Sequence, residues 1–114
     1  MIQSYRFGEL VTDKATYTKD LKILSDKTVV HPWWRSQGHL VVVQDVEDLL
    51  REEPQTLILG KGDPGRMSPD RELVDKLQKE GVRLVDLPTR EAVQEYNAAR
   101  ERGEKVCAGF HLTC

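Results

Sequence analysis

The chain has 114 residues, with 17 basic and 19 acidic side chains and a formal net charge of −2. This length suits one folded unit, and we expect a single α/β domain over residues 1–114. The near balance of charge excludes the broad basic surface of a nucleic-acid-binding protein. No apolar run is long enough for a membrane span. Two cysteines and no signal-peptide pattern favour a cytoplasmic location.

Residues 1–34 carry the alternating patterns of short β-strands, and we expect a β-rich extension here. The stretch 5–11 predicts one strand with a bulge or close approach at Gly8. Residues 16–24 predict one or two short strands, with their lysines and aspartate facing solvent. A further strand should end before Pro32, whose ring nitrogen cannot donate a hydrogen bond. Together these strands predict an antiparallel ribbon.

Residues 35–114 alternate between helical and extended patterns, which predicts an α/β core. Strands are predicted at 55–60, 82–87 and 105–113, and helices at 45–53, 68–81 and 90–102. This order favours a central, largely parallel sheet with helices on its faces. Ligands of such sheets usually bind beyond the carboxyl ends of the strands.

Two of the predicted helices begin at residues suited to that position. Ser68 is placed to cap one helix, and Pro69 fits its first helical position because the missing N–H is not needed there. Thr89 is placed to cap the last helix, which turns Tyr96 inward as part of an apolar stripe. Both predictions rest on the first backbone amides of a helix, which have no acceptor inside the helix and need one from a capping side chain.

Gly60, Gly62 and Gly65 spell the dinucleotide-binding pattern G-x-G-x-x-G after a predicted strand. Asp86 follows near the separation of about 20 residues expected for a ribose-binding acid. In that motif, however, the third glycine already lies in the helix. Pro69 would then sit inside the helix and cost roughly 3 kcal/mol. We therefore interpret the third glycine as part of a proline turn and set dinucleotide binding aside.

A weaker phosphate-type site is left open at the same loop. The Walker pattern is absent, because Lys-Ser/Thr does not follow Gly65. Gly60 and Gly62 would allow backbone amides to face an anion, with Lys61 and Arg66 beside them. The alternative, which we favour, is that the glycines only permit a tight exit from the strand.

Cys107 and His111 fall on the same face of the last predicted strand. They would be about 13 Å apart at ~3.3 Å per residue, which is too far for a nucleophile–base pair or for two ligands of one metal. We expect Cys107 to be buried and inert. No catalytic residue, metal site or cofactor is predicted.

Two further features allow either a structural or a binding role. Trp33 and Trp34 stand beside Arg35, where they are suited to stack a planar ligand or grip a partner. The favoured alternative is that one tryptophan plugs the core and Arg35 shields it. Asn97, within the last predicted helix, is either a brace for a neighbouring loop or a pocket residue.

The stretches TREAVQEYNAARERGEKVCAGFHLTC, TLILGKG, LQKEGVRLVDLPT and WWRSQGH resemble a small domain family. That family includes the adipogenesis-associated domain protein and the mitochondrial complex I assembly factor 3. The resemblance implies a three-layer α/β/α fold, with a mixed central sheet of about five strands and a small N-terminal β-ribbon. It implies no enzymatic activity, and the eukaryotic members are known through partners and assembly roles. The complex I role is not carried over, because this sequence has no mitochondrial targeting extension.

Several positions of this sequence match family motifs, and the resemblance is consistent with their lining a shared pocket: Tyr96, Asn97, Gly60, Gly62, Trp34 and Arg35. With Lys61, Arg66 and His111 they complete the predicted site for a ligand or partner. The first expected function is a cytoplasmic protein-binding or assembly module. The alternative is a small anion- or metabolite-binding protein or an enzyme, with a pocket at the carboxyl end of strand 55–60. Neither nucleic acid nor a membrane is an expected partner.

Overall fold

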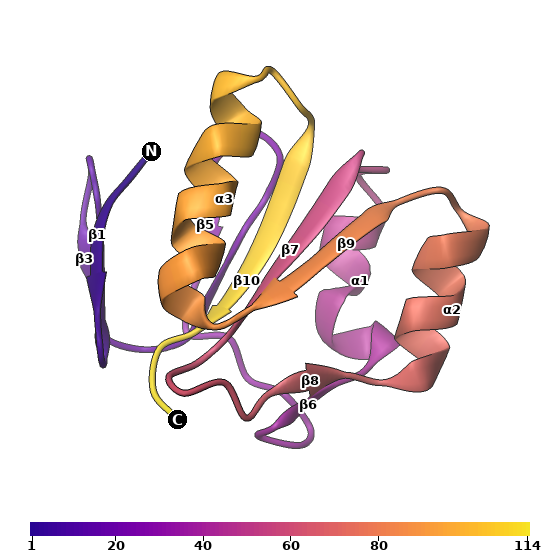
Figure 1. Ribbon diagram of the computed structural model, residues 1–114, viewed down its shortest axis with the longest axis horizontal. Helices are drawn as coiled ribbons and strands as arrows, with labels where there is room; N and C mark the ends of the chain where they lie inside the picture. The colour runs from indigo at the N-terminus through magenta and orange to yellow at the C-terminus, as the bar shows by residue number, and fades with distance from the viewer.

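A computed structural model describes all residues 1–114 and shows a central sheet covered on both faces (Figure 1). The strands are β1 (Ile2–Arg6), β2 (Glu9–Thr12), β3 (Thr16–Tyr17), β4 (Leu21–Ile23), β5 (Val29–Val30), β6 (Leu40–Val41), β7 (Thr56–Lys61), β8 (Ser68–Pro69), β9 (Arg83–Leu87) and β10 (Val106–His111). The helices are the 3-10 helix η1 (Val43–Val46) and the α-helices α1 (Glu47–Leu50), α2 (Arg71–Lys79) and α3 (Thr89–Glu101).

The central sheet has five strands in the order β5-β4-β10-β7-β9. It is mixed, because β10 is parallel to β7 and antiparallel to β4. Ala108, in the middle of β10, pairs with Ile58 on one side and Ile23 on the other. His111 pairs with Lys61, so the carboxyl ends of β10 and β7 lie side by side.

Two hydrophobic clusters fill the faces of this sheet, which gives the expected three layers. On one face, α3 and the β1–β2 hairpin pack on residues such as Ala108 and Phe110. On the other, η1, α1 and α2 pack on residues such as Leu57 and Cys107. Successive residues of β10 therefore serve opposite cores, as strand alternation requires.

The N-terminal region differs from the expected single strand over 5–11. The chain turns at Phe7–Gly8 and forms the β1–β2 hairpin, to which β3 adds a third antiparallel strand. Gly8 has φ +83°, a conformation that glycine adopts without the steric cost of a side chain. Strands β4 and β5, which come from the segment expected as an extension, pair into the central sheet instead.

The helix predicted to open at Ser68 begins later, at Arg71. Residues Ser68–Pro69 form β8, which runs parallel to β6. The amides of Ser68 and Asp70 donate to His39 and Val41 at 3.0 and 2.8 Å, so the strand hydrogen bonds fall on either side of Pro69. The missing N–H of the proline points away from the pairing partner, and the capping prediction for Ser68 is wrong for this reason.

The remaining helices are short. The helix predicted over 45–53 is divided into η1 and α1 and ends before Pro54. The longest helix, α3, has 13 residues. None of the helices combines the length and the apolar character needed to cross a membrane.

Candidate functional site

The glycine loop after β7 is closed by contacts within the protein. The Gly62 amide donates to Thr89 Oγ1 at 2.8 Å, and the Asp63 amide donates to the Thr113 carbonyl at 2.9 Å. Gly62 has φ +95°, and a Cβ placed on it would lie 2.2 Å from the Thr113 oxygen. Glycine is needed here because the C-terminal tail passes directly against the loop, and these two amides are already used.

Thr89 connects this loop to β10 rather than capping α3. Its hydroxyl accepts from Gly62 and donates to the His111 carbonyl at 2.5 Å. The residue before α3 is Pro88, and no side chain caps that helix. The capping prediction for Thr89 is therefore wrong, because its hydroxyl bonds the glycine loop and the last residue of β10 instead.

The loop also lacks the geometry of a dinucleotide-binding turn. That motif requires a helix whose amino end begins within the glycine pattern. Here a turn and β8 separate Gly62 from α2, which begins at Arg71. The structure agrees with a local role for the third glycine in the turn.

Four of the predicted site residues, two near the glycine loop and two on α3, do not converge on one another. The Lys61 ammonium is 3.9 Å from the Asp86 carboxylate, and Arg66 is exposed. Asn97 braces β1, because its side-chain oxygen accepts from the Ile2 amide at 3.0 Å and its nitrogen donates to the Ile2 carbonyl at 2.8 Å. Tyr96 packs in the α3 core. The structure does not gather these four side chains into one pocket.

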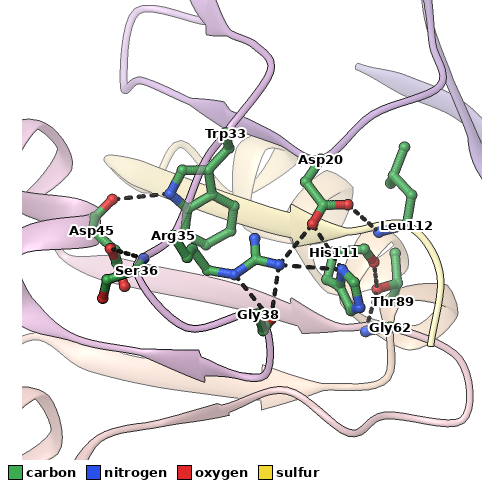
Figure 2. A network of polar contacts seen from close by, with 10 residues as sticks. All are labelled: Asp20, Trp33, Arg35, Ser36, Gly38, Asp45, Gly62, Thr89, His111 and Leu112. Atoms are coloured by element: carbon green, nitrogen blue, oxygen red, sulfur yellow. Dashed lines mark hydrogen bonds and ion pairs between the residues drawn. The ribbon is translucent and has the colours of Figure 1, made fainter.

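A polar cluster instead forms at the carboxyl end of β10 (Figure 2). Asp20, in the link between β3 and β4, has one carboxylate oxygen 2.7 Å from both Arg35 Nη2 and His111 Nδ1. Its other oxygen accepts from the Leu112 amide at 2.9 Å. The aspartate expected to face solvent thus holds two of the predicted site residues together.

Arg35 is held on three sides. Its guanidinium carbon lies 4.5 Å from the centre of the Trp33 ring, and Nε and Nη2 donate to the Gly38 carbonyl at 3.2 and 3.0 Å. The Trp33 indole N–H donates in turn to the Asp45 carbonyl at 3.0 Å. Trp33 is 4% exposed and Trp34 is 77% exposed. The first tryptophan therefore plugs the core and Arg35 covers it, whereas the second faces solvent.

Asp20 is the anion of the cluster. Burial alone would raise the pKa of Asp20, but hydrogen bonds from His111, Leu112 and Arg35 outweigh burial and hold that pKa below its ordinary value of 3.8. A carboxylate only accepts hydrogen bonds, so the hydrogen between Asp20 and His111 is on Nδ1 of the imidazole. Asp20 thereby fixes the orientation of both the imidazole ring and the guanidinium.

Two nitrogens of the cluster are buried and have no hydrogen-bond partner, namely Arg35 Nη1 and His111 Nε2. Only 5% of the Arg35 side chain and 10% of the His111 side chain are exposed. Both residues line a cavity of about 290 Å³, together with Lys19, Asp20 and Trp34. In Figure 2, Nη1 points away from Gly38 into the space between Trp33 and Asp20. We call these residues and this cavity the Arg35–His111 site, which combines an unused arginine donor with positive charge.

Catalytic and metal chemistry find less support in the same region. The imidazole of His111 contacts Asp20 and Arg35, but no hydroxyl or thiol nucleophile is hydrogen-bonded to it. Cys107 is fully buried, as predicted, and burial raises the pKa of its thiol to about 12, which disfavours the reactive thiolate. No group of three or more His, Cys, Asp or Glu side chains is placed to hold a metal ion.

The fold and this cluster define a small α/β protein with a polar cluster at one end of its central sheet. The chain belongs to the DUF498/DUF598 family, described as proteins of unknown function, which matches residues 2–111. This agrees with the resemblance found in the sequence.

Solved structures of similar proteins share the fold over nearly the full chain. The protein MT938 is 28% identical, with a TM-score of 0.84 over 100% of this chain and 98% of that one. A conserved hypothetical protein from Pyrococcus horikoshii is 21% identical, with a TM-score of 0.80 over 100% and 99%. A protein from Xanthomonas campestris is 14% identical, with a TM-score of 0.81 over 98% and 83%. The last two likenesses show the fold alone.

Proposed function

We propose that this protein is a small binding protein whose Arg35–His111 site receives an anionic group of a metabolite. The observation that carries this proposal is the pair of buried, unpartnered nitrogens, Arg35 Nη1 and His111 Nε2. A buried donor without a partner costs about 1–3 kcal/mol. An anionic oxygen that accepts from Arg35 Nη1 would offset that cost. The site differs from the predicted pocket, because it stands at the end of β10 rather than in the glycine loop after β7.

The electrostatic arrangement supports an anion over a cation. Arg35 uses Nη2 for Asp20 and Gly38, which leaves Nη1 of the guanidinium fork to bind a further oxygen. Lys19 lines the same cavity and adds a second positive charge.

The proposal is tested by thermal unfolding with acetate, inorganic phosphate and sulfate as probes. A ligand at 100 times its dissociation constant stabilises the folded state by about 2.7 kcal/mol. We expect one of these anions to raise the melting temperature of the wild type and of Arg66→Met, which removes the exposed arginine of the glycine loop. Arg35→Met should bind at least about tenfold more weakly.

Arg35→Lys separates loss of charge from loss of the fork, because it retains the positive charge and has a better chance of preserving the fold. We expect it to bind more weakly than the wild type, with a melting temperature in the absence of ligand closer to the wild type than that of Arg35→Met. Equal responses of Arg35→Lys, Arg35→Met and the wild type, or no response to any anion, would contradict the proposal.

A second candidate function, a protein-binding module, is favoured by exposed aromatic side chains at the same end of the molecule. Trp34 is one of three large hydrophobic residues that are exposed, and Phe7 is another. The turn carrying Phe7 lies beside the C-terminal tail, because the Gly8 amide donates to the Leu112 carbonyl at 2.8 Å. Leu112 and Trp34 line one cavity. Exposed aromatics of this kind are common anchors of protein interfaces.

Affinity capture from native lysate tests this second function. We expect a stoichiometric partner to be retained by the wild type and by Gln94→Ala, a change on the exposed side of α3. The double variant Phe7→Ala, Trp34→Ala should lose that partner while unfolding at the same temperature. The absence of any stoichiometric partner across repeated captures would count against the module.

A further inference from the structure

The side chain of Tyr96 is buried, but its hydroxyl has no hydrogen-bond partner within the protein. Tyr96 is 2% exposed, yet its hydroxyl makes no hydrogen bond to the protein and is not among the fully enclosed polar atoms. The hydroxyl of Tyr5, which is also buried, donates to the Leu112 carbonyl at 2.9 Å. Buried tyrosine hydroxyls usually find such a partner. The Tyr96 hydroxyl is therefore a free donor that opens onto a space.

That space is a cavity of about 150 Å³ between the β-ribbon and the central sheet. Its walls are mainly apolar and include Ile2, Tyr17, Ile23 and Val29 beside Tyr96. An apolar cavity of about 150 Å³ in another protein stays dry and takes up benzene. The dimensions therefore suit a single ring, and we call this space the Tyr96 cavity.

Charged residues at the cavity are biased toward the positive sign. Lys14 and Lys27 line it, and neither ammonium forms an ion pair. Asp13 is the only carboxylate among its lining residues. The space is small, so a charge on a bound ring would lie well within a Debye length of both lysines. The balance favours an anionic ligand over a cationic one.

We propose that the Tyr96 cavity binds a ring-sized aromatic carboxylate, whose ring packs on the apolar walls and whose carboxylate accepts from Tyr96 and faces Lys14 and Lys27. An inorganic phosphate would lose hydration among these walls without equal compensation. An aromatic amine would meet two ammonium groups. Burial raises the pKa of Tyr96, which keeps its hydroxyl protonated as a donor. This inference is independent of the Arg35–His111 site, whose residues are not among those that line the Tyr96 cavity.

The test is an NMR titration of the full chain with benzoate, benzamide and benzylamine, followed through backbone amide signals. We expect benzoate to shift signals of Ile23, Val29 and Tyr96, and to bind about tenfold more tightly than benzamide and benzylamine. Shifts confined to the region of His111 would assign benzoate to the other site and overturn the proposal. Equal affinity for the three probes, or no shifts at all, would overturn it as well.

Matched variants separate the hydrogen bond from the charge. Tyr96→Phe keeps the ring in the core and should weaken benzoate binding about fivefold by removing the donor. The double variant Lys14→Gln, Lys27→Gln should reduce benzoate to the affinity of benzamide. The control double variant Lys79→Gln, Lys105→Gln removes the same charge elsewhere and should bind benzoate as the wild type does. Unchanged benzoate affinity in both Tyr96→Phe and Lys14→Gln, Lys27→Gln would exclude this mode of binding.

Discussion

The carboxyl ends of β7 and β10 are adjacent and the two strands are parallel, yet the polar groups at the two ends differ in whether they have hydrogen-bond partners. After β7, Gly62 and the next amide are occupied by Thr89 and the C-terminal tail. At the end of β10, His111 and its neighbour Arg35 each keep one buried nitrogen without a partner. A glycine pattern that resembles a ligand-binding turn thus serves close packing, whereas the unpartnered nitrogens lie beside it, on His111 of β10 and on Arg35 of the link between β5 and β6.

The difference shows that glycine spacing alone does not identify a ligand-binding loop, because the loop amides can already have partners within the protein. A glycine can be required because a ligand approaches the backbone or because another part of the chain does. At Gly62 the approaching group is the carbonyl of Thr113. A ligand-binding glycine loop can be told from a closely packed one by identifying the acceptor of each backbone amide.

The largest expected effect comes from removing the anion that holds the β10 cluster together. Asp20→Ala leaves Arg35 and the Leu112 amide without their carboxylate, and we expect a loss of about 4 kcal/mol in the free energy of unfolding. Urea titration measures this loss. Asp63→Ala is the matched change in the glycine loop, where the carboxylate lies 3.9 Å from the exposed Arg90. It should change stability by less than about 1 kcal/mol, and equal losses in the two variants would refute the contrast.

A somewhat smaller loss is expected from crowding the β7 loop. Gly62→Ala combines a positive φ with a Cβ 2.2 Å from a backbone oxygen, and we expect a loss of about 3 kcal/mol. Gly65→Ala shares the positive φ of +119° but meets no atom closer than 3.5 Å. It should lose only about 1 kcal/mol. Equal losses by urea titration would show that backbone conformation, and not contact with the tail, requires glycine at this loop.

Removing the hydroxyl that joins the two strand ends should have an intermediate effect. Thr89→Val keeps the shape of the side chain but leaves the Gly62 amide buried without an acceptor, and we expect a loss of about 2 kcal/mol. Thr89→Ser retains the hydroxyl and should recover most of that stability. If the serine variant unfolds at the same urea concentration as the valine variant, the bridging role is excluded.

Acid should weaken the β10 end through Asp20. The folded-state pKa of Asp20 is lowered, so its stabilising contribution is present above the ordinary value of 3.8 and is lost as the pH falls through the folded-state value. Stability measured by urea titration should decline less steeply below that pH in Asp20→Asn than in the wild type. Identical slopes in the two proteins would contradict this assignment.

The smallest effect is expected at Arg66, the exposed cation of the glycine loop. Arg66→Met should change the free energy of unfolding by no more than about 0.5 kcal/mol. It should also leave the response to anions unchanged. A loss of anion binding in Arg66→Met, with binding retained in Arg35→Met, would move the site back to the end of β7.

Much of the fold could be predicted because its signals are local. The apolar runs of β7 and β10 and the stripe of α3 lie within single elements and are visible in the sequence. The start of α2 could not be found in this way, because the role of Ser68–Pro69 depends on pairing with β6, far away in the chain. The hairpin turn at Gly8 was missed for a simpler reason, since a glycine within an alternating stretch is also compatible with a bulge.

The candidate site was only partly visible in the sequence. Arg35 and His111 stood out through their neighbours, a pair of tryptophans and a strand pattern. Asp20 gave no signal, because one aspartate in a polar stretch usually faces solvent. Its role arises when β4 pairs with β10 and carries the preceding residue to His111. Long-range pairing of this kind leaves no periodicity in the sequence.

The position of β10 in the sheet has a consequence for how the molecule assembles. This strand lies between β4 and β7, although it follows both at a long distance along the chain. The central sheet is therefore complete only when this last segment pairs with both strands, and pairing between residues so far apart in the chain slows folding. Until insertion, β4 and β7 each present an open edge on which another chain can pair. Changes that delay the closing strand should promote aggregation before they reduce the stability of the finished protein.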